Sequence, residues 1–126
     1  MTTPTLPLRE HVELAPEFLE EAEAEFAAGK PLKGAEMLWG AVAHALTAVA
    51  LQNGWPHDSH GSLKRVAKRL PNVPGASHWL TEFDVMEWFH SHFYHGQMSD
   101  RRIAQYRPRA RRLVNRLLAV AQPADG

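Results

Sequence analysis

One stretch of this sequence, from Pro31 to about Asn53, is apolar nearly all round when it is placed on a helix. A helix without a polar face is stable in a globular domain only when other elements cover it. This one is also rich in small residues, which let neighbours approach closely: Gly34, Ala35, Gly40, Ala41, Ala43, Ala45 and Ala48. The stretch therefore predicts a central helix with other helices packed around it.

The rest of the chain also has its apolar residues at steps of three and four, which is the helical period rather than the alternation of strands. Serine caps, glycine stops and prolines set the expected bounds. We expect four further helices: from Arg9 or Ala15 to Ala28, from a cap at Ser62 to about Leu70, from a cap at Ser77 to Gly96, and from Ser99 or Asp100 onward, with a kink or restart at Pro108. The predicted fold is all-α, an up-and-down antiparallel bundle of about five helices.

Length and composition place this bundle in a single domain over residues 1–126, with 1–8 and 122–126 as flexible tails. Hydrophobic residues make up 44% and charged residues 22%, as in ordinary globular proteins. Without cysteine, the chain has no disulfide, thiol nucleophile or thiolate metal site, and we expect a cytoplasmic protein. We expect no membrane insertion, because Met1–Pro7 does not resemble a secretory signal and the most apolar run, Ala41–Leu51, is short.

The net charge is +0, but the charges are unevenly placed along the chain. The first helical segment is acidic, with Glu10, Glu13, Glu17, Glu20, Glu21, Glu23 and Glu25. The last one is basic, with Arg101, Arg102, Arg107, Arg109, Arg111, Arg112 and Arg116. The favoured interpretation is that the two segments lie side by side and attract one another. The alternative is a basic face for partners that carry phosphate.

Alternating helix directions would bring three polar groups to one end of the bundle. The groups are the loop with Trp55, His57, Asp58 and His60, the end of the fourth helix with His92, Tyr94 and His95, and the start of the fifth with Arg101 and Arg102. Two other histidines, His44 and His90, fall on apolar stripes, where a hydrogen-bonded structural histidine is the favoured interpretation. The predicted functional end is therefore this meeting point.

Three segments of the chain resemble the HEPN superfamily, most closely its PaREP branch. Residues 19–46 resemble the opening helical hairpin, residues 53–63 (NGWPHDSHGSL) resemble the turn into the third helix, and residues 89–94 (FHSHFY) resemble the region that holds a His-x-Tyr. The resemblance covers about Pro16 to Leu118. It implies a HEPN-like bundle that forms a homodimer.

Many HEPN proteins are ribonucleases whose motif is an arginine, then four to six intervening residues, then a histidine. If His92 and Tyr94 take the His-x-Tyr places, the arginine belongs at position 85, 86 or 87, where this chain has Val85, Met86 and Glu87. The ribonuclease pair is incomplete, so the expected activity leans away from an enzyme, with His92 and Tyr94 as the best catalytic candidates. Other HEPN members bind nucleotides or act as partners of nucleotidyltransferases.

The leading hypothesis is thus a HEPN-like module for a nucleotide, RNA or a nucleotidyltransferase-type partner, with Trp55, His60, Arg101 and Arg102 as binding residues and no cofactor. Helix N-terminal amides and guanidinium groups at the start of the fifth helix suit a phosphate. A second hypothesis is a metal-dependent enzyme using His57, His60, His92 and His95, because His92 and His95 lie one turn apart. A third is a plain protein-interaction module.

Overall fold

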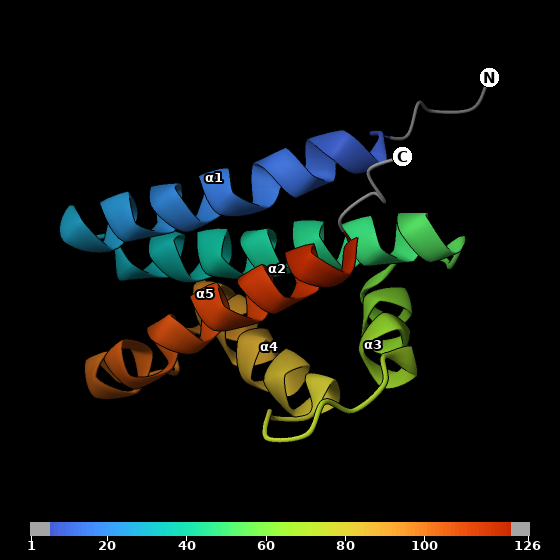
Figure 1. Ribbon diagram of the computed structural model, residues 1–126. Coiled ribbons are helices and arrows are strands. Elements are labelled where there is room, and N and C mark those ends of the chain that lie inside the picture. Colours follow the sequence, from blue (N-terminus) through green and yellow to red (C-terminus); the bar gives the residue numbers. More distant parts are fainter. Residues whose placement is uncertain (1–5, 122–126) are drawn as a thin grey trace.

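The computed structural model describes residues 6–121, which form five helices and no strand (Figure 1). The helices are α1 (Leu8–Ala27), α2 (Pro31–Asn53), α3 (His60–Arg69), α4 (Trp79–His95) and α5 (Asp100–Ala121). The all-α prediction with about five helices is confirmed. The expected flexible tails fall largely outside the described residues, and Leu8, placed in the first tail, is already the first residue of α1.

Helix α2 is the central element, as its composition predicts, and it packs against all four other helices. Its small residues permit a close approach to α1. A β-carbon added to Gly40 would lie 2.6 Å from the Phe18 ring, and one added to Gly34 would lie 2.9 Å from the Phe26 ring. On the other side, the largest fully buried side chains of α4 and α5 fill the core: Phe83, Met86, Phe89 and Leu117.

By length and composition, α2 is also the one helix within residues 6–121 that could cross a membrane. The apolar part of α2 is longer than the Ala41–Leu51 run, so the expectation based on that run underestimated the length of the apolar part. Two thirds of this apolar part, 67%, is buried inside the structure. The apolar surface of α2 is therefore largely occupied by packing against the other helices.

The helix directions differ from the expected up-and-down order. Helices α1 and α2 are antiparallel, and so are α3 and α4, whereas α5 runs in the same direction as α2 (Figure 1). The side-chain amide of Gln52 accordingly lies 3.0 Å from the carbonyl oxygen of Val120, near the last residues of both helices. The reason is the length of α3, which has 10 residues and spans only ~15 Å, against ~35 Å for α2. Since α3 cannot run back along α2, the chain reverses through α4 instead.

Two helix caps lie elsewhere than predicted. Helix α3 starts earlier, because Ser59 has an extended backbone and its hydroxyl accepts the N–H of Ser62 at 3.0 Å. The expected cap at Ser62 is thus the donor of the capping bond. Helix α4 has His78 at its N-cap, not Ser77, and no side chain caps it.

The two interior prolines do not divide their helices. Pro16 lies inside α1 and Pro108 inside α5, and each helix is continuous through its proline. The predicted restart at Pro108 is wrong. An interior proline removes one backbone hydrogen bond, and the buried apolar stripe of α5 on both sides of it, from Ile103 to Leu117, holds the helix against the core.

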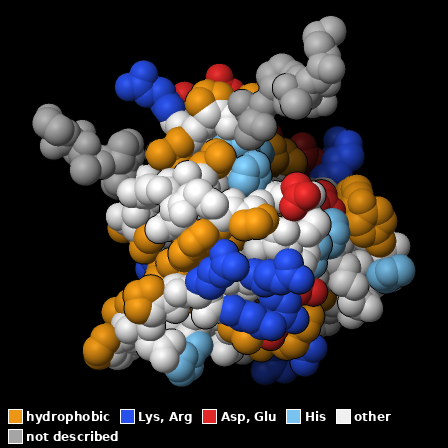
Figure 2. Space-filling view, turned by 90° about the vertical axis from the view of Figure 1, so that its right-hand side faces the viewer, with side chains coloured by type: hydrophobic (Ala, Val, Ile, Leu, Met, Phe, Trp, Pro, Cys, Tyr) orange, Lys and Arg blue, Asp and Glu red, His pale blue; other side chains and the backbone are white. Residues whose placement is uncertain are grey.

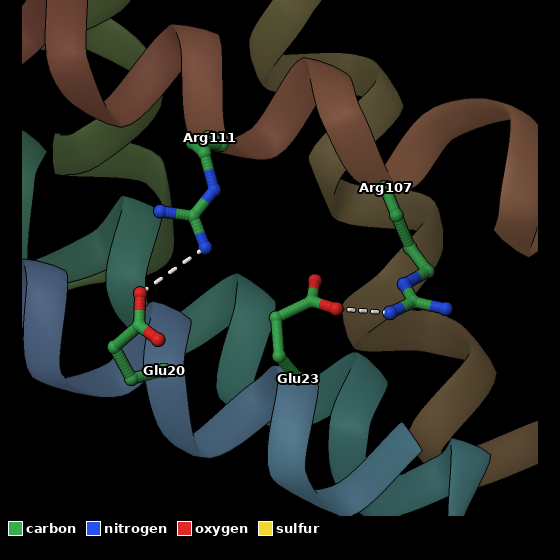
Figure 3. Close-up of polar contacts among 4 residues, drawn as sticks. All are labelled: Glu20, Glu23, Arg107 and Arg111. Atoms are coloured by element: carbon green, nitrogen blue, oxygen red, sulfur yellow. Dashed lines mark hydrogen bonds and ion pairs between the residues drawn. The ribbon is translucent and has the colours of Figure 1, made fainter. Parts of the chain in front are cut away.

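The acidic and basic helices pair with one another, which confirms the favoured interpretation of the uneven charges. Figure 3 shows that Arg111 donates to Glu20 at 3.2 Å and that Arg107 donates to Glu23. These pairs join α1 to α5 in antiparallel order. Not all basic side chains are used in this way, since Lys and Arg also gather on the side of the molecule shown in Figure 2, where few acidic side chains accompany them.

Candidate histidine site between helices α2, α3 and α4

Trp39, a buried residue of α2, forms the floor of a histidine site. The His60 ring from the first turn of α3 stacks on it, with 4.9 Å between ring centres and 26° between planes. His90 of α4 lies 5.2 Å from the same indole, and Phe83 contacts it edge-on at 5.6 Å. Three helices thus contribute side chains to one aromatic cluster, because α3 begins beside the middle of α2.

Each of the two histidines faces a carboxylate. Nε2 of His60 lies 3.3 Å from Glu87 on α4, and Nδ1 of His90 lies 3.1 Å from Glu36 on α2. The two imidazole rings are nearly parallel, with centres 5.6 Å apart. Both are partly exposed to solvent. Two carboxylate-paired imidazoles therefore lie side by side at the surface.

The carboxylates decide which ring nitrogens remain for a ligand. A carboxylate accepts a hydrogen bond, so it favours the tautomer whose N–H faces it and leaves the other nitrogen as an acceptor. Within residues 6–121, Nδ1 of His60 and Nε2 of His90 have no hydrogen-bond partner. The site can thus accept hydrogen bonds or protons at two neighbouring atoms.

Tyr94 and Glu36 extend the site on its outer side. The Tyr94 ring meets His90 edge-on at 5.4 Å and is 67% exposed, so its face is available for stacking. Glu36 also lines a neighbouring hollow of about 320 Å³ with Lys33, Met37 and Phe93. Its oxygen Oε2 is buried without a hydrogen-bond partner in the described part of the chain. A buried acceptor of this kind gains stability from a donor, such as a water molecule or the N–H group of a ligand.

His92 does not take part in this site. It is only 4% exposed, although its helix face was predicted to be less apolar, and its Nδ1 accepts the backbone N–H of Met98 at 2.8 Å. Burial lowers the pKa of His92, which keeps the ring neutral and able to accept this bond. The side chain therefore holds the turn between α4 and α5, and His90 takes the place beside Tyr94.

The other predicted site residues lie apart from one another. Trp55 is under the guanidinium of Arg69, and His57 is close enough to α1 for its charge to lower the pKa of His11. Arg102, by contrast, lies at the start of α5, with its guanidinium 5.7 Å from the centre of the Trp88 ring. The start of α5 lies at the opposite end of α2 from the loop with Trp55 (Figure 1).

The expected meeting of all three polar groups is thus not observed, because α5 starts at the other end from the loop after α2. Arg101 and His95 are exposed near that start. Two of the predicted residues, His60 and Tyr94, contact the same ring, that of His90. No group of three or more histidine, aspartate or glutamate side chains among residues 6–121 is arranged to hold a metal ion, so the four histidines of the metal hypothesis do not form one cluster.

His44 has the structural role that its apolar surroundings indicated. Its Nδ1 lies 2.9 Å from Nδ1 of His11 on α1, and the Phe18 ring contacts it edge-on. Burial lowers the pKa of both histidines, and the charge of His57 adds to this effect at His11, as the charge of His11 does at His44. One ring must donate and the other accept, so the pair is a neutral link between α1 and α2.

Comparison with known proteins adds the family. Residues 10–114 match the archaeal PaREP1/PaREP8 family. The chain belongs to this family. Neither the curated proteins nor the solved structures contain a significant match to it. The PaREP part of the resemblance is therefore confirmed over most of the chain.

Sequence reasoning missed three residues of the site in this PaREP1/PaREP8 protein: Glu36, Trp39 and Glu87. One signal was present, because Glu36 is the only acidic side chain in the apolar helix α2. A carboxylate in such a helix needs a partner. Trp39 and Glu87 carried no comparable signal, since their roles depend on where α3 begins relative to α2 and α4.

Proposed function

We propose that this PaREP1/PaREP8 protein is a HEPN-like module that binds RNA or a nucleotide at the histidine site. The observation that carries the proposal is the pair of carboxylate-bound imidazoles, His60 and His90, beside the exposed ring of Tyr94. Unpaired bases stack on exposed aromatic rings. Their exocyclic amines donate to carboxylates, and Glu36 supplies an unpartnered acceptor.

The resemblance to HEPN proteins supports the same place on the chain. Residues 89–94 resemble the region of the HEPN His-x-Tyr, and they form the last turns of α4, where the site lies. In this chain the histidine beside the tyrosine is His90, one turn before it, because His92 is buried. The proposed site therefore lies in the region that the resemblance implies, with His90 in place of His92 as the histidine beside the tyrosine.

Binding of a fluorescently labelled single-stranded RNA, followed by anisotropy at low salt, tests the proposal. Tyr94→Ala should weaken binding about 5- to 100-fold, because loss of one base–aromatic stack costs ~1–3 kcal/mol. Glu36→Gln should also weaken binding of a ligand that presents an amine. Folding should change little in Tyr94→Ala, since this side chain is largely exposed.

The matched control is His78→Ala, at the other end of α4, where the side chain of an exposed histidine is hydrogen-bonded to Asn72. This variant should bind as the wild type does. If wild type binds neither RNA nor mononucleotides at low salt, the proposal is wrong. Equal losses in Tyr94→Ala and His78→Ala would also contradict it, because they would mean that binding is not local.

Acid–base catalysis on the bound ligand is a second candidate function. It is favoured by the orientation of the two rings, since each carboxylate leaves one ring nitrogen of His60 or His90 open at the surface. Imidazole both accepts and donates protons near neutral pH. Incubation with RNA and separation of the products tests it, with His90→Asn as the variant that should abolish any turnover. If the RNA stays intact after incubation with the wild-type protein, catalysis is refuted and the proposed function is binding without catalysis.

We also propose a homodimer, with α4 in the interface, and a nucleotidyltransferase-type protein as partner. Trp88 of α4 is 42% exposed, which leaves much of a large apolar side chain open for a second copy of the chain. Light scattering at micromolar concentration tests the dimer. Trp88→Lys should shift a dimer toward monomer, and a wild-type monomer would refute this part. Co-purification with a nucleotidyltransferase encoded by a neighbouring gene tests the partner.

A further inference from the structure

A second pocket lies away from the histidine site, where the connection between α3 and α4 passes over α5. It has a volume of about 290 Å³, and its charged lining consists of Glu82 from α4 and Arg109, Arg112 and Arg116 from α5. The arginines are spaced by three and four residues, so they share one face of the helix. Ser77, just before α4, forms part of the opposite wall.

The single carboxylate in this pocket is already neutralised. Arg109 donates to both oxygens of Glu82, through Nε at 3.2 Å and through Nη2 at 2.5 Å. Glu82 is 5% exposed, so this pair is buried in the wall. Among the lining residues, two positive charges remain, those of Arg112 and Arg116.

Neither remaining arginine is paired with a carboxylate of residues 6–121. The guanidinium of Arg116 lies 4.0 Å from the centre of the Trp79 ring, and its Nη2 donates to the carbonyl oxygen of Ser77 at 3.3 Å. Arg112 makes no ion pair within residues 6–121. These residues thus offer N–H donors in a cavity where no anion from the described part of the chain meets them.

The backbone adds to the positive potential of the pocket. Helix α4 starts directly after Ser77, and its N-cap, His78, turns its ring to Asn72 and leaves the first turn without a side-chain cap. Uncapped N–H groups and the helix dipole favour an anion at that end.

We propose that this pocket binds the dianionic phosphate group of a phosphate monoester. Two uncompensated guanidinium groups match two negative charges, and the planar donors of arginine suit phosphate oxygens. A phosphodiester carries a single charge and two ester substituents, so it fits this pocket less well. The site is independent of the proposed function, because it shares no residue with the histidine site.

Isothermal titration calorimetry of the full chain with inorganic phosphate, methyl phosphate and dimethyl phosphate tests the proposal, because none of these ligands carries a base that could occupy the histidine site. Both phosphate and the monoester should bind with one site per chain, and the diester should bind at least about tenfold more weakly, since it lacks one charge. Affinity for the monoester should rise as pH increases through about 6, where the second proton of a phosphate monoester dissociates.

Arg112→Gln is the informative variant, because Arg112 has no ion pair to lose and folding should be retained. It should weaken monoester binding about tenfold or more, as expected for the loss of a charged hydrogen bond. The matched control is Arg111→Gln, its neighbour in sequence, which pairs with Glu20 on the other face of α5. Unchanged binding in Arg112→Gln, equal losses in both variants, equal affinity for the diester, or no binding by wild type would each overturn the proposal.

Discussion

Removing one member of the buried Glu82–Arg109 pair should destabilise the fold more than removing both. The carboxylate joins α4 to α5 through two hydrogen bonds from the guanidinium, and the bond from Arg109 to Glu82 is the main reason that the pKa of Arg109 is raised. The guanidinium stays charged when its partner is lost, because arginine remains protonated at neutral pH even without a carboxylate beside it. An unpaired buried charge is costly, whereas two apolar side chains of similar size can pack there.

The expected magnitudes follow from the burial of each partner. Loss of one partner from a fully buried pair costs about 3–5 kcal/mol. In Glu82→Met the remaining guanidinium is 26% exposed and can be hydrated, so we expect about 2–3 kcal/mol. In Arg109→Met the remaining carboxylate is 7% exposed, so we expect about 3–4 kcal/mol. The double variant should lie within about 1 kcal/mol of wild type.

Urea unfolding at neutral pH, followed by circular dichroism, measures all four proteins of this cycle. The slope of unfolding free energy against urea concentration should be the same in each, because the exposed surface changes little. The reasoning is refuted if the loss of unfolding free energy in the double variant equals the sum of the two single losses, or if Arg109→Met costs less than about 1 kcal/mol. Either result would mean that the pair is well solvated.

Two further predictions concern packing and pH. Gly40→Ala should destabilise the protein by up to about 2 kcal/mol in urea unfolding, because the clash with Phe18 outweighs a helix-propensity gain of ~1 kcal/mol. The control is Gly61→Ala in α3, which has no close neighbour and should be neutral or stabilising. His11 and His44 have lowered pKa values, so below about pH 6.5 the unfolded chain binds protons that the folded chain excludes. The free energy of unfolding should therefore fall as pH decreases from about 7.5 to about 5, with a smaller fall in His44→Gln; a pH-independent wild type would contradict this linkage.

The histidine site shows how far sequence patterns reach. His60 and Tyr94 were expected near one another, and they both lie beside His90. His90 was expected to be a hydrogen-bonded histidine on an apolar stripe, and it is hydrogen-bonded to Glu36 but only partly buried, because helical periodicity gives a residue's face and not how completely the neighbouring helix covers it. Conversely, His92 was predicted on a less apolar face and is buried, because the turn after α4 folds back so that Met98 donates to it.

The choice of phosphate-binding arginines illustrates the same limit. Arg101 and Arg102 were predicted because they start a helix, and the structure places them apart from the loop with Trp55. Arg112 and Arg116 were counted only as part of a basic helix. Their sequence spacing shows that they share a face, but the wall opposite them is made by the connection after α3, whose path depends on tertiary packing.

The sequence by itself determined the helical fold, the central place of the apolar helix α2 and the attraction between acidic α1 and basic α5. These features depend on periodicity, composition and charge, which are local properties of the chain. Only the tertiary structure decided that α5 runs in the same direction as α2 and that α3 begins beside Trp39. Those arrangements depend on the reach of a 10-residue helix and on the fit of side chains between distant segments, which no local pattern encodes.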